Sequence, residues 1–159
     1  MTDENPTEDA ATDTATDTAT DTPTDALMQI AHDQPPFAQL LGLRVISARP
    51  DCVLGELPVT EGLANRNGVL HGGAIMALAD NMGGTATFLN IGPGAGTTTI
   101  ESKTNFFRAV RIGDTAHTET TPLHLGRSTM VWQTRITGSD GKLAALVTQT
   151  QMILRKTDR

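Results

Sequence analysis

A glycine pair and a single acid within an apolar segment are the features of this 159-residue sequence that could do chemistry. Gly72 and Gly73 follow His71 at the start of a segment with helical periodicity, and Asp80 lies in its interior. A helix start has unpaired N–H groups and a partial positive charge, so the Gly72 N–H could hold an oxyanion. An acid among Ala, Leu, Ile and Met is costly unless it is paired or used. Together these residues indicate a hydrolytic site in which Asp80 activates water or attacks the substrate directly.

The spacing of these residues decides how such a site must be assembled. Gly72 precedes Asp80 by eight residues, which is about 12 Å along one helix and too far for both to act on one carbonyl group. His71 and Asp80 also differ in direction by roughly 180° around that helix. We therefore expect a two-fold dimer in which the helix start of one subunit lies beside the helix middle of its partner, giving two equivalent sites. A monomer should be inactive.

The elements that must position these residues can be read from hydrophobic periodicity. From His71 to about Leu89 apolar residues recur at helical spacing and most other positions are Ala, Gly or Thr, which predicts a helix wrapped on all sides. Short helices are predicted from Thr24 or Asp25 to His32 and from Phe37 to Leu41. Strands are predicted over residues 43–48, 52–59, 97–107, 114–125, 128–137 and 142–154. This order predicts an α+β fold with one antiparallel sheet curled around the long central helix.

Composition divides the chain near residue 25. Residues 1–25 hold eight acids, no Lys or Arg, and three copies of Ala-Thr-Asp-Thr, which predicts a disordered acidic tail before one domain over residues 26–159. That domain has ten acids and twelve bases, and no basic run that would suit nucleic acid. The single Cys52 excludes an internal disulfide, and no apolar run suits a membrane span or a signal peptide. We expect a cytoplasmic protein that binds neither nucleic acid nor membrane.

The segment from Asn65 to Asp80 resembles the hotdog-fold acyl-CoA thioesterases. The resemblance points to the branch that includes phenylacetate-pathway (PaaI-like), bacterial aryl-CoA and dihydroxynaphthoyl-CoA thioesterases. A second matching block, PLHLG at 122–126 and VWQ at 131–133, is closer to the dihydroxynaphthoyl-CoA group, although that group usually carries Glu where Asp80 stands. The resemblance covers about residues 36 to 154. It implies hydrolysis of an aryl- or medium-chain acyl-CoA, with no cofactor, by a homodimer that commonly pairs into a tetramer.

The resemblance also implies roles for individual residues. The Gly72 N–H of one subunit would hold the thioester oxygen while Asp80 of the other subunit acts as general base or nucleophile. Asn65 would orient water or the thioester, His71 would order the loop, and Thr99 would assist the water. Asn65, His71 and Thr99 each have a structural alternative: Asn is a common turn residue, His71 can serve as a helix cap, and Thr99 lies in a Thr-rich strand.

For the residues that contact substrate, the sequence offers several candidates. The CoA phosphates would be bound by Arg127 with the backbone of Gly126 and Ser128, or by Arg108 or Lys103, and ordinary solvated charge is the alternative for each. The other candidate substrate-binding residues lie near the helix and the strand facing it, where plain core packing is the alternative: Val69, Gly73, Met82, Phe88 and Phe106. Four scattered histidines and one cysteine offer no zinc-binding spacing, so no metal is expected.

Two other functions fit the same fold. A hotdog hydratase would pair an Asp and a His in one site, but His71 is about half a turn out of phase with Asp80. A hotdog domain that binds acyl-CoA without cleaving it is the other alternative. As a regulator it would carry a DNA-binding segment, and residues 24–42 are too short for a helix-turn-helix domain.

Overall fold

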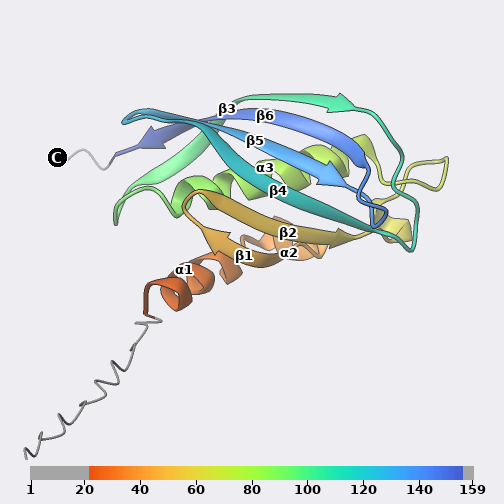
Figure 1. The fold of residues 1–159 in the computed structure, drawn as a ribbon, viewed down its shortest axis with the longest axis horizontal. Helices are drawn as coiled ribbons and strands as arrows, with labels where there is room; N and C mark the ends of the chain where they lie inside the picture. The colour runs from red at the N-terminus through yellow and green to blue at the C-terminus, as the bar shows by residue number, and fades with distance from the viewer. Residues whose placement is uncertain (1–21, 156–159) are drawn as a thin grey trace, which may run out of the picture.

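A long helix lies against the concave face of a curled antiparallel sheet in the computed structural model (Figure 1). The structure describes residues 22–155, with side chains from residue 27 onward. The order of elements is α1 (Thr22–His32), α2 (Pro36–Leu41), β1 (Arg44–Arg49), β2 (Cys52–Pro58), the 3-10 turn η1 (Glu61–Leu63), α3 (Gly72–Phe88), β3 (Gly96–Phe106), β4 (Thr115–Leu125), β5 (Thr129–Thr137) and β6 (Leu143–Leu154). This is the α+β hotdog architecture that the sequence predicts.

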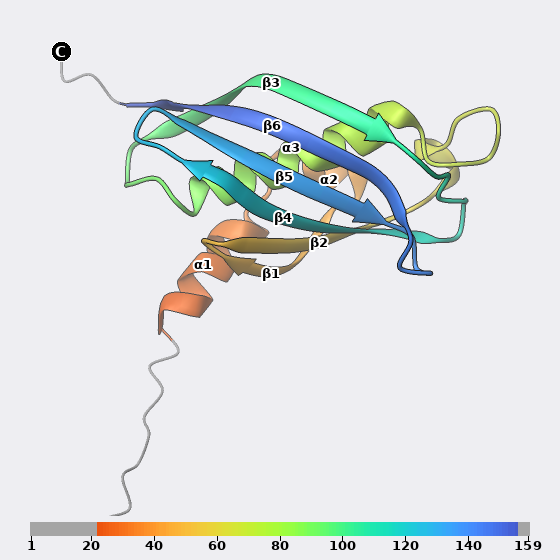
Figure 2. The ribbon, with the colours of Figure 1, turned by 45° about the horizontal axis from the view of Figure 1, so that its top comes forward.

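The six strands are ordered β1-β2-β4-β5-β6-β3, and every neighbouring pair is antiparallel. The last strand of the chain therefore lies between β5 and β3, and β3 forms one edge of the sheet. Figure 2 shows β4, β5, β6 and β3 as one curved layer with α3 behind it. β3 and β6 pair from Gly96 with Leu154 to Phe106 with Ala145, with one register shift between Thr99 and Glu101.

The core forms where α3 meets the inward-facing side chains of the strands. Along β5 and β6 buried residues alternate with more exposed ones, as expected of strands with one face against a helix. On α3 the fully buried Leu78, Ala79, Met82 and Ala86 face that layer. Trp132 on β5 is also fully buried, and its indole Nε1–H donates to Thr87 Oγ1 at 2.8 Å.

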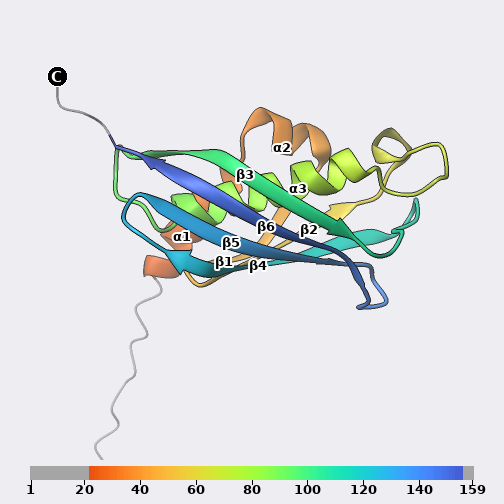
Figure 3. The same ribbon diagram turned by 90° about the horizontal axis from the view of Figure 1, so that it is seen from above.

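The two N-terminal helices pack against the outer parts of the fold. α1 contacts β1, and α2 contacts α3, as Figure 3 shows from above. α2 ends at Gly42, whose φ of 78° is the left-handed conformation that favours glycine. Among the described residues, no helix is long and apolar enough to cross a bilayer.

The predicted element boundaries agree with the structure to within about two residues, with one extension. α1 begins at Thr22, before the predicted cap at Thr24 or Asp25, so residues 22–25 of the predicted tail are helical. Of the predicted tail, residues 1–21 lie outside the described part of the chain. The segment between β2 and α3 contains η1 and two isolated bridges, Ala64 with Leu70 and Val69 with Arg111.

Candidate functional site

Asp80 lies in the middle of α3 at the exposed surface of the protomer. Its Oδ1 accepts two hydrogen bonds: one from Thr99 Oγ1 on β3 at 2.7 Å and one from Gln149 Nε2 on β6 at 2.8 Å. The structure therefore brings together Asp80 and Thr99, two residues that the family resemblance assigns to the site, and their roles stay predictions. No described residue bonds to Oδ2, so the carboxylate is held by one oxygen and can offer the other to a ligand.

Further polar side chains hold the Thr99 hydroxyl that contacts Asp80. Thr99 Oγ1 accepts from Gln149 Nε2 at 3.0 Å and from Gln151 Nε2 at 2.8 Å. Thr97 Oγ1 in turn donates to Gln151 Oε1 at 2.8 Å. Gln149 and Gln151 are each only 1% exposed. Buried amides are costly unless they are hydrogen-bonded, and here they are bonded toward the carboxylate.

The start of α3 is organised around His71. Its Nδ1 accepts from the Gly73 N–H at 2.9 Å, and its carbonyl accepts from the Ile75 N–H at 3.1 Å, so His71 is the N-cap. Its own N–H donates to the Leu63 carbonyl at 2.8 Å. The Gly72 N–H has no acceptor among the described residues. It remains free to bind an oxyanion, the role predicted for it.

Asn65 shapes the loop that leads into this helix. Its side-chain Oδ1 accepts from the Asn67 N–H at 2.9 Å, its N–H donates to the Val69 carbonyl at 2.8 Å, and its carbonyl accepts from the Gly68 N–H at 3.1 Å. These contacts are those of a turn residue, the structural alternative for Asn65. The predicted role of Asn65 with water or thioester stays a prediction.

Gly72 and Asp80 remain apart within one protomer. Both lie on the uninterrupted helix α3, so about 12 Å of helix axis separates them. The oxyanion donor and the acid therefore meet only if a second copy of the chain supplies one of them. His71 is likewise occupied at the helix start, which disfavours a hydratase that would pair it with Asp80.

A groove of about 1000 Å³ opens beside Asp80. It runs between the end of α1 with the start of α2 on one side and β3 on the other, and Asp80, Thr99, Gln34 and Phe88 are among its lining residues. Phe88, predicted near the acyl group, thus lies in the same groove as the acid. A further acid, Asp33, lines it as well.

The other predicted substrate contacts are divided between the helix start and the core. Phe106 lies beside Gly72: a Cβ placed on that glycine would be 3.4 Å from the Phe106 ring. Val69 lies in the loop, and Gly73 lines a small cavity with His71. Met82 is fully buried and packs on β2, where its sulfur would be 2.8 Å from a Cβ on Gly55. This placement agrees with the plain core alternative for Met82 rather than with an acyl contact within the protomer.

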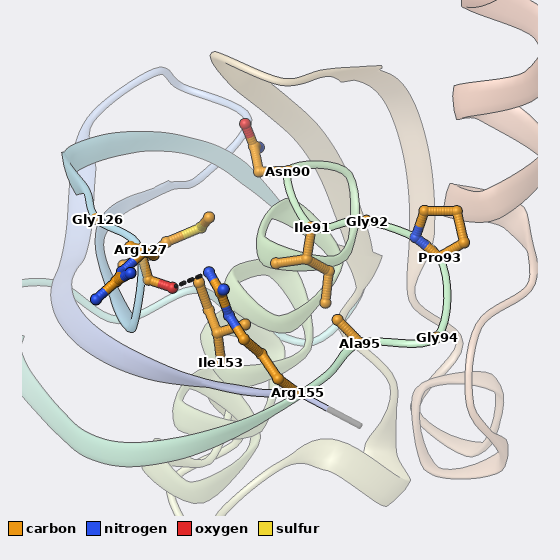
Figure 4. A pocket seen from close by; sticks show the side chains of 11 residues that line it. Asn90, Ile91, Gly92, Pro93, Gly94, Ala95, Gly126, Arg127, Ile153 and Arg155 are labelled. Carbon is orange, nitrogen blue, oxygen red and sulfur yellow. Dashed lines mark hydrogen bonds between the residues drawn. The ribbon is translucent and has the colours of Figure 1, made fainter. Parts of the chain in front are cut away.

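The predicted phosphate-binding residues lie at opposite ends of α3. Arg127 and Gly126, next to Ser128 in the β4–β5 turn, border a cavity of about 430 Å³ with the loop that follows α3 (Figure 4). There Arg155 Nη2 donates to the Arg127 carbonyl at 3.0 Å.

Arg108 lines a separate cavity of about 400 Å³ near the start of α3, with Arg111 and Lys142. The helix between the two cavities has 17 residues, about 25 Å in length. One phosphate group therefore cannot contact Arg108 and Arg127 of the same protomer, so they are separate candidates.

The shifted ionisable groups lie outside the Asp80 contacts. The Ser139 hydroxyl, followed by the Thr115 N–H, lowers the pKa of the Asp114 carboxyl. The Lys142 N–H lowers the pKa of Asp140. Burial, followed by the nearby Glu119 charge, raises the pKa of the Cys52 thiol. Within residues 22–155 no cluster of three or more His, Cys, Asp or Glu side chains could hold a metal.

Comparison with known proteins places this geometry in a family. The thioesterase superfamily profile matches residues 67–145, from the loop before α3 to the start of β6. The protein named "Putative esterase" in Deinococcus radiodurans is 32% identical over 111 residues, covering 69% of this chain and 73% of that protein. The chain therefore belongs to the thioesterase superfamily, and it is an enzyme of the thioester-hydrolysing class.

Solved structures agree with this assignment. The thioesterase HI1161 of Haemophilus influenzae has a TM-score of 0.75 and 27% identity, over 86% of this chain and 93% of that one. PaaI of E. coli, from the phenylacetic acid degradation operon, has a TM-score of 0.76 and 24% identity, over 84% and 97%. A Streptococcus pneumoniae protein described as a hypothetical thioesterase, solved with coenzyme A, has a TM-score of 0.65 and 24% identity, over 72% and 88%. At 24% identity, the last two structures show only that they share the fold of this chain.

Gln149 and Gln151 are the site residues that the sequence analysis missed. A signal for them exists in β6, where Ala145, Val147, Gln149 and Gln151 occupy alternate positions on the buried face. Two amides that continue an inward-facing apolar row must find partners inside the protein. That pattern could have marked them as hydrogen-bonding partners of other polar side chains.

Proposed function

We propose that this chain hydrolyses an acyl-CoA thioester to the free acid and CoA, in sites shared between two subunits of a homodimer. The observation that carries the proposal is the Asp80 carboxylate, which has Oδ1 bonded to Thr99 and Gln149 and Oδ2 free beside a groove. A carboxylate in such a position can serve as the general base or the nucleophile of thioester hydrolysis. The groove volume suits an acyl-pantetheine arm, and aryl or medium-chain acyl groups fit the apolar Phe88 at its wall.

The second part of the site would come from the partner. Gly72 of the partner subunit would donate its N–H to the thioester oxygen, because that N–H has no acceptor among residues 22–155 of its own subunit. The solved S. pneumoniae neighbour with coenzyme A supports CoA as the leaving group. The single cysteine agrees with a cytosolic setting, and pairing of two dimers into a tetramer is the further assembly that we propose.

Two routes use the same groups. As general base, Asp80 takes a proton from water, the resulting hydroxide attacks the thioester carbon, and the C–S bond breaks as the proton passes to the sulfur of CoA. As nucleophile, Asp80 attacks that carbon and expels CoA thiolate, and water then hydrolyses the acyl-Asp80 anhydride. In both routes the negative oxygen of the tetrahedral intermediate is bound by the Gly72 N–H of the partner subunit.

The test is CoA release by the purified protein from phenylacetyl-, hydroxybenzoyl-, dihydroxynaphthoyl- and straight-chain acyl-CoA. With the best substrate, Asp80→Asn should lower kcat by about 100-fold or more, since general-base catalysis contributes that much. Asp51→Asn, which changes an exposed acid outside the groove, is the matched control and should retain wild-type turnover.

Wild-type turnover by Asp80→Asn would contradict the proposed mechanism. Tight binding of an acyl-CoA with no cleavage would instead support the non-catalytic binding alternative. Label in the Asp80 carboxylate after a single turnover in H₂¹⁸O would identify the nucleophilic route, because it arises only when water attacks the Asp80 carbonyl carbon of the anhydride.

A further inference from the structure

We infer that Gln149 and Gln151 are positioning residues, which fix the orientation of the Asp80 carboxylate through a directed chain of hydrogen bonds. The inference rests on the proposed role of Asp80 and extends it to β6, the last strand of the chain. Neither glutamine lies in the segment with the glycine pair and Asp80, and each acts through other side chains.

The numbers of donors and acceptors give this series of hydrogen bonds a single direction. Thr99 Oγ1 accepts from both glutamine amides, from Gln149 at 3.0 Å and Gln151 at 2.8 Å. A hydroxyl has two acceptor positions and one proton. Both acceptor positions are filled, so the Thr99 proton has one remaining use, the bond to Asp80 Oδ1 at 2.7 Å.

The two glutamines have separate parts in this arrangement. Gln149 Nε2 has two protons, of which one goes to Asp80 Oδ1 at 2.8 Å and the other to Thr99. Gln151 is held in turn by Thr97, whose hydroxyl donates to Gln151 Oε1. Asp80 Oδ1 thus receives two donors from two strands, which restricts the carboxylate and leaves Oδ2 without a donor among the described residues.

Gln149 has a buried polar atom without a partner in the described part of the chain, so its presence is not explained by a gain in stability. Gln149 is 1% exposed, and its Oε1 has no hydrogen-bond partner among the described residues. An unpaired buried acceptor is destabilising, and an apolar side chain of similar size would avoid it. A buried amide with only its NH₂ group bonded, and bonded to the acid, is better explained by what it does for Asp80.

The helix is shaped to admit this amide. A Cβ on Gly83 would be 2.5 Å from Gln149 Oε1 and 2.9 Å from its Cδ. A side chain at this position, one turn beyond Asp80, would force the Gln149 amide to move from its place beside α3. The absence of a side chain at Gly83 therefore leaves the space that the Gln149 amide occupies.

The decisive experiment is Gln149→Leu in the full-length enzyme, with an acyl-CoA that the wild type cleaves. We expect kcat to fall by about tenfold or more while KM changes by less than about twofold, since orientation of the acid acts in the transition state. The melting temperature should change little, because removal of the unpaired acceptor offsets the loss of the two bonds from the Gln149 amide. Falling activity with little change in stability is a split that a purely structural glutamine would not produce.

The matched control is Thr134→Val on the neighbouring strand. Thr134 is also 1% exposed, and its hydroxyl bonds to Thr120 at 2.9 Å without touching Asp80. Its loss should lower the melting temperature and leave kcat and the pH profile unchanged.

Gln149→Glu provides a second readout. It would place another carboxylate within bonding distance of Asp80 Oδ1, behind a groove that Asp33 also lines. Two acids this close share protons, so the acid limb of the pH–kcat profile should move to higher pH.

The outcomes separate this inference from the proposed function. If Asp80→Asn keeps wild-type turnover, the proposed function fails and the positioning role fails with it. If Asp80→Asn is inactive while Gln149→Leu has the wild-type kcat and Gln149→Glu the wild-type pH profile, the positioning role alone is overturned. Should Gln149→Leu not fold, Gln151→Leu decides on the same kcat and KM criteria.

Discussion

Hydroxyls that face the core of this protein differ in whether they find a partner. Thr118 and Thr120 both lie on β4 with buried side chains, two residues apart on the same face. Thr120 Oγ1 bonds to Thr134 Oγ1, whereas Thr118 Oγ1 has no partner among the described residues. The two positions therefore form a natural pair for measuring what a buried hydroxyl contributes.

Thr118→Val should raise the free energy of unfolding by about 1 kcal/mol, because it removes an unpaired buried oxygen and keeps the branched shape. Thr120→Val should lower it by about 1 kcal/mol, because it leaves the Thr134 hydroxyl unpaired. Urea titration of the two variants measures both values. Equal destabilisation by both substitutions would contradict the assignment.

At the scale of one element, α3 contains two adjacent glycines with different surroundings. A Cβ on Gly83 would collide with the Gln149 amide, whereas a Cβ on Gly84 would meet nothing within 4 Å. Alanine is favoured over glycine inside a helix by about 0.5–1 kcal/mol.

Gly84→Ala should therefore stabilise the protein by about 0.5–1 kcal/mol. Gly83→Ala should destabilise it by about 1–3 kcal/mol, since overpacking forces Gln149 to move. Chemical denaturation followed by circular dichroism compares the two. A stabilising effect of Gly83→Ala would show that Gln149 has room to shift and that its placement is not tightly fixed.

The turn between β5 and β6 is joined to the start of β4 by a carboxylate. Asp114 accepts from the Ser139 hydroxyl and from the Thr115 N–H at 2.7 Å, and the Ser139 bond is the main cause of its lowered pKa. A lowered folded-state pKa means that this stabilisation is present above the unfolded pKa and is lost as the pH falls through the folded one.

Asp114→Asn should therefore be less stable than the wild type near neutral pH, and the difference should shrink below about pH 4, where an unfolded Asp becomes protonated. Thermal melts from pH 7 to pH 3 follow the difference. A gap of constant size across that range would mean that the charge of Asp114 does not stabilise the turn.

The elements themselves were largely predictable from the sequence. Strands with one buried face leave a period-two pattern, and the bounds predicted for β6 (142–154) differ from those observed by one residue. The start of α3 was visible because a glycine pair follows a capping histidine. The start of α1 was placed too late, since short helix ends depend on local contacts that weak propensities do not fix.

The candidate site was predictable only in part. The need of Asp80 for a partner follows from its apolar neighbours, and Thr99 was expected from family resemblance. Gln149 and Gln151 are 69 and 71 residues further along the chain than Asp80, and their approach depends on β6 pairing with β3. Local patterns do not specify which strands pair across such distances, so the order of the sheet and the amides had to come from the structure.

At the scale of the whole molecule, the separation of Gly72 and Asp80 on one helix makes activity depend on association. Serial dilution of the enzyme should lower its specific activity, with a midpoint that coincides with dissociation of the dimer. Turnover and native mass measured over the same concentration range test this. A monomer with full specific activity would contradict the shared site.

The position of β6 has a consequence for how the protein is made. β3 has β6 as its only partner within the sheet, and β6 supplies the amides around Asp80. During synthesis, β3 (residues 96–106) has no strand to pair with until residues 143–154 have left the ribosome, because these residues form its partner β6. The acid on α3 is therefore synthesised well before the β6 amides that contact it, and the bond from Gln149 to Asp80 can form only after residues 143–154 have left the ribosome.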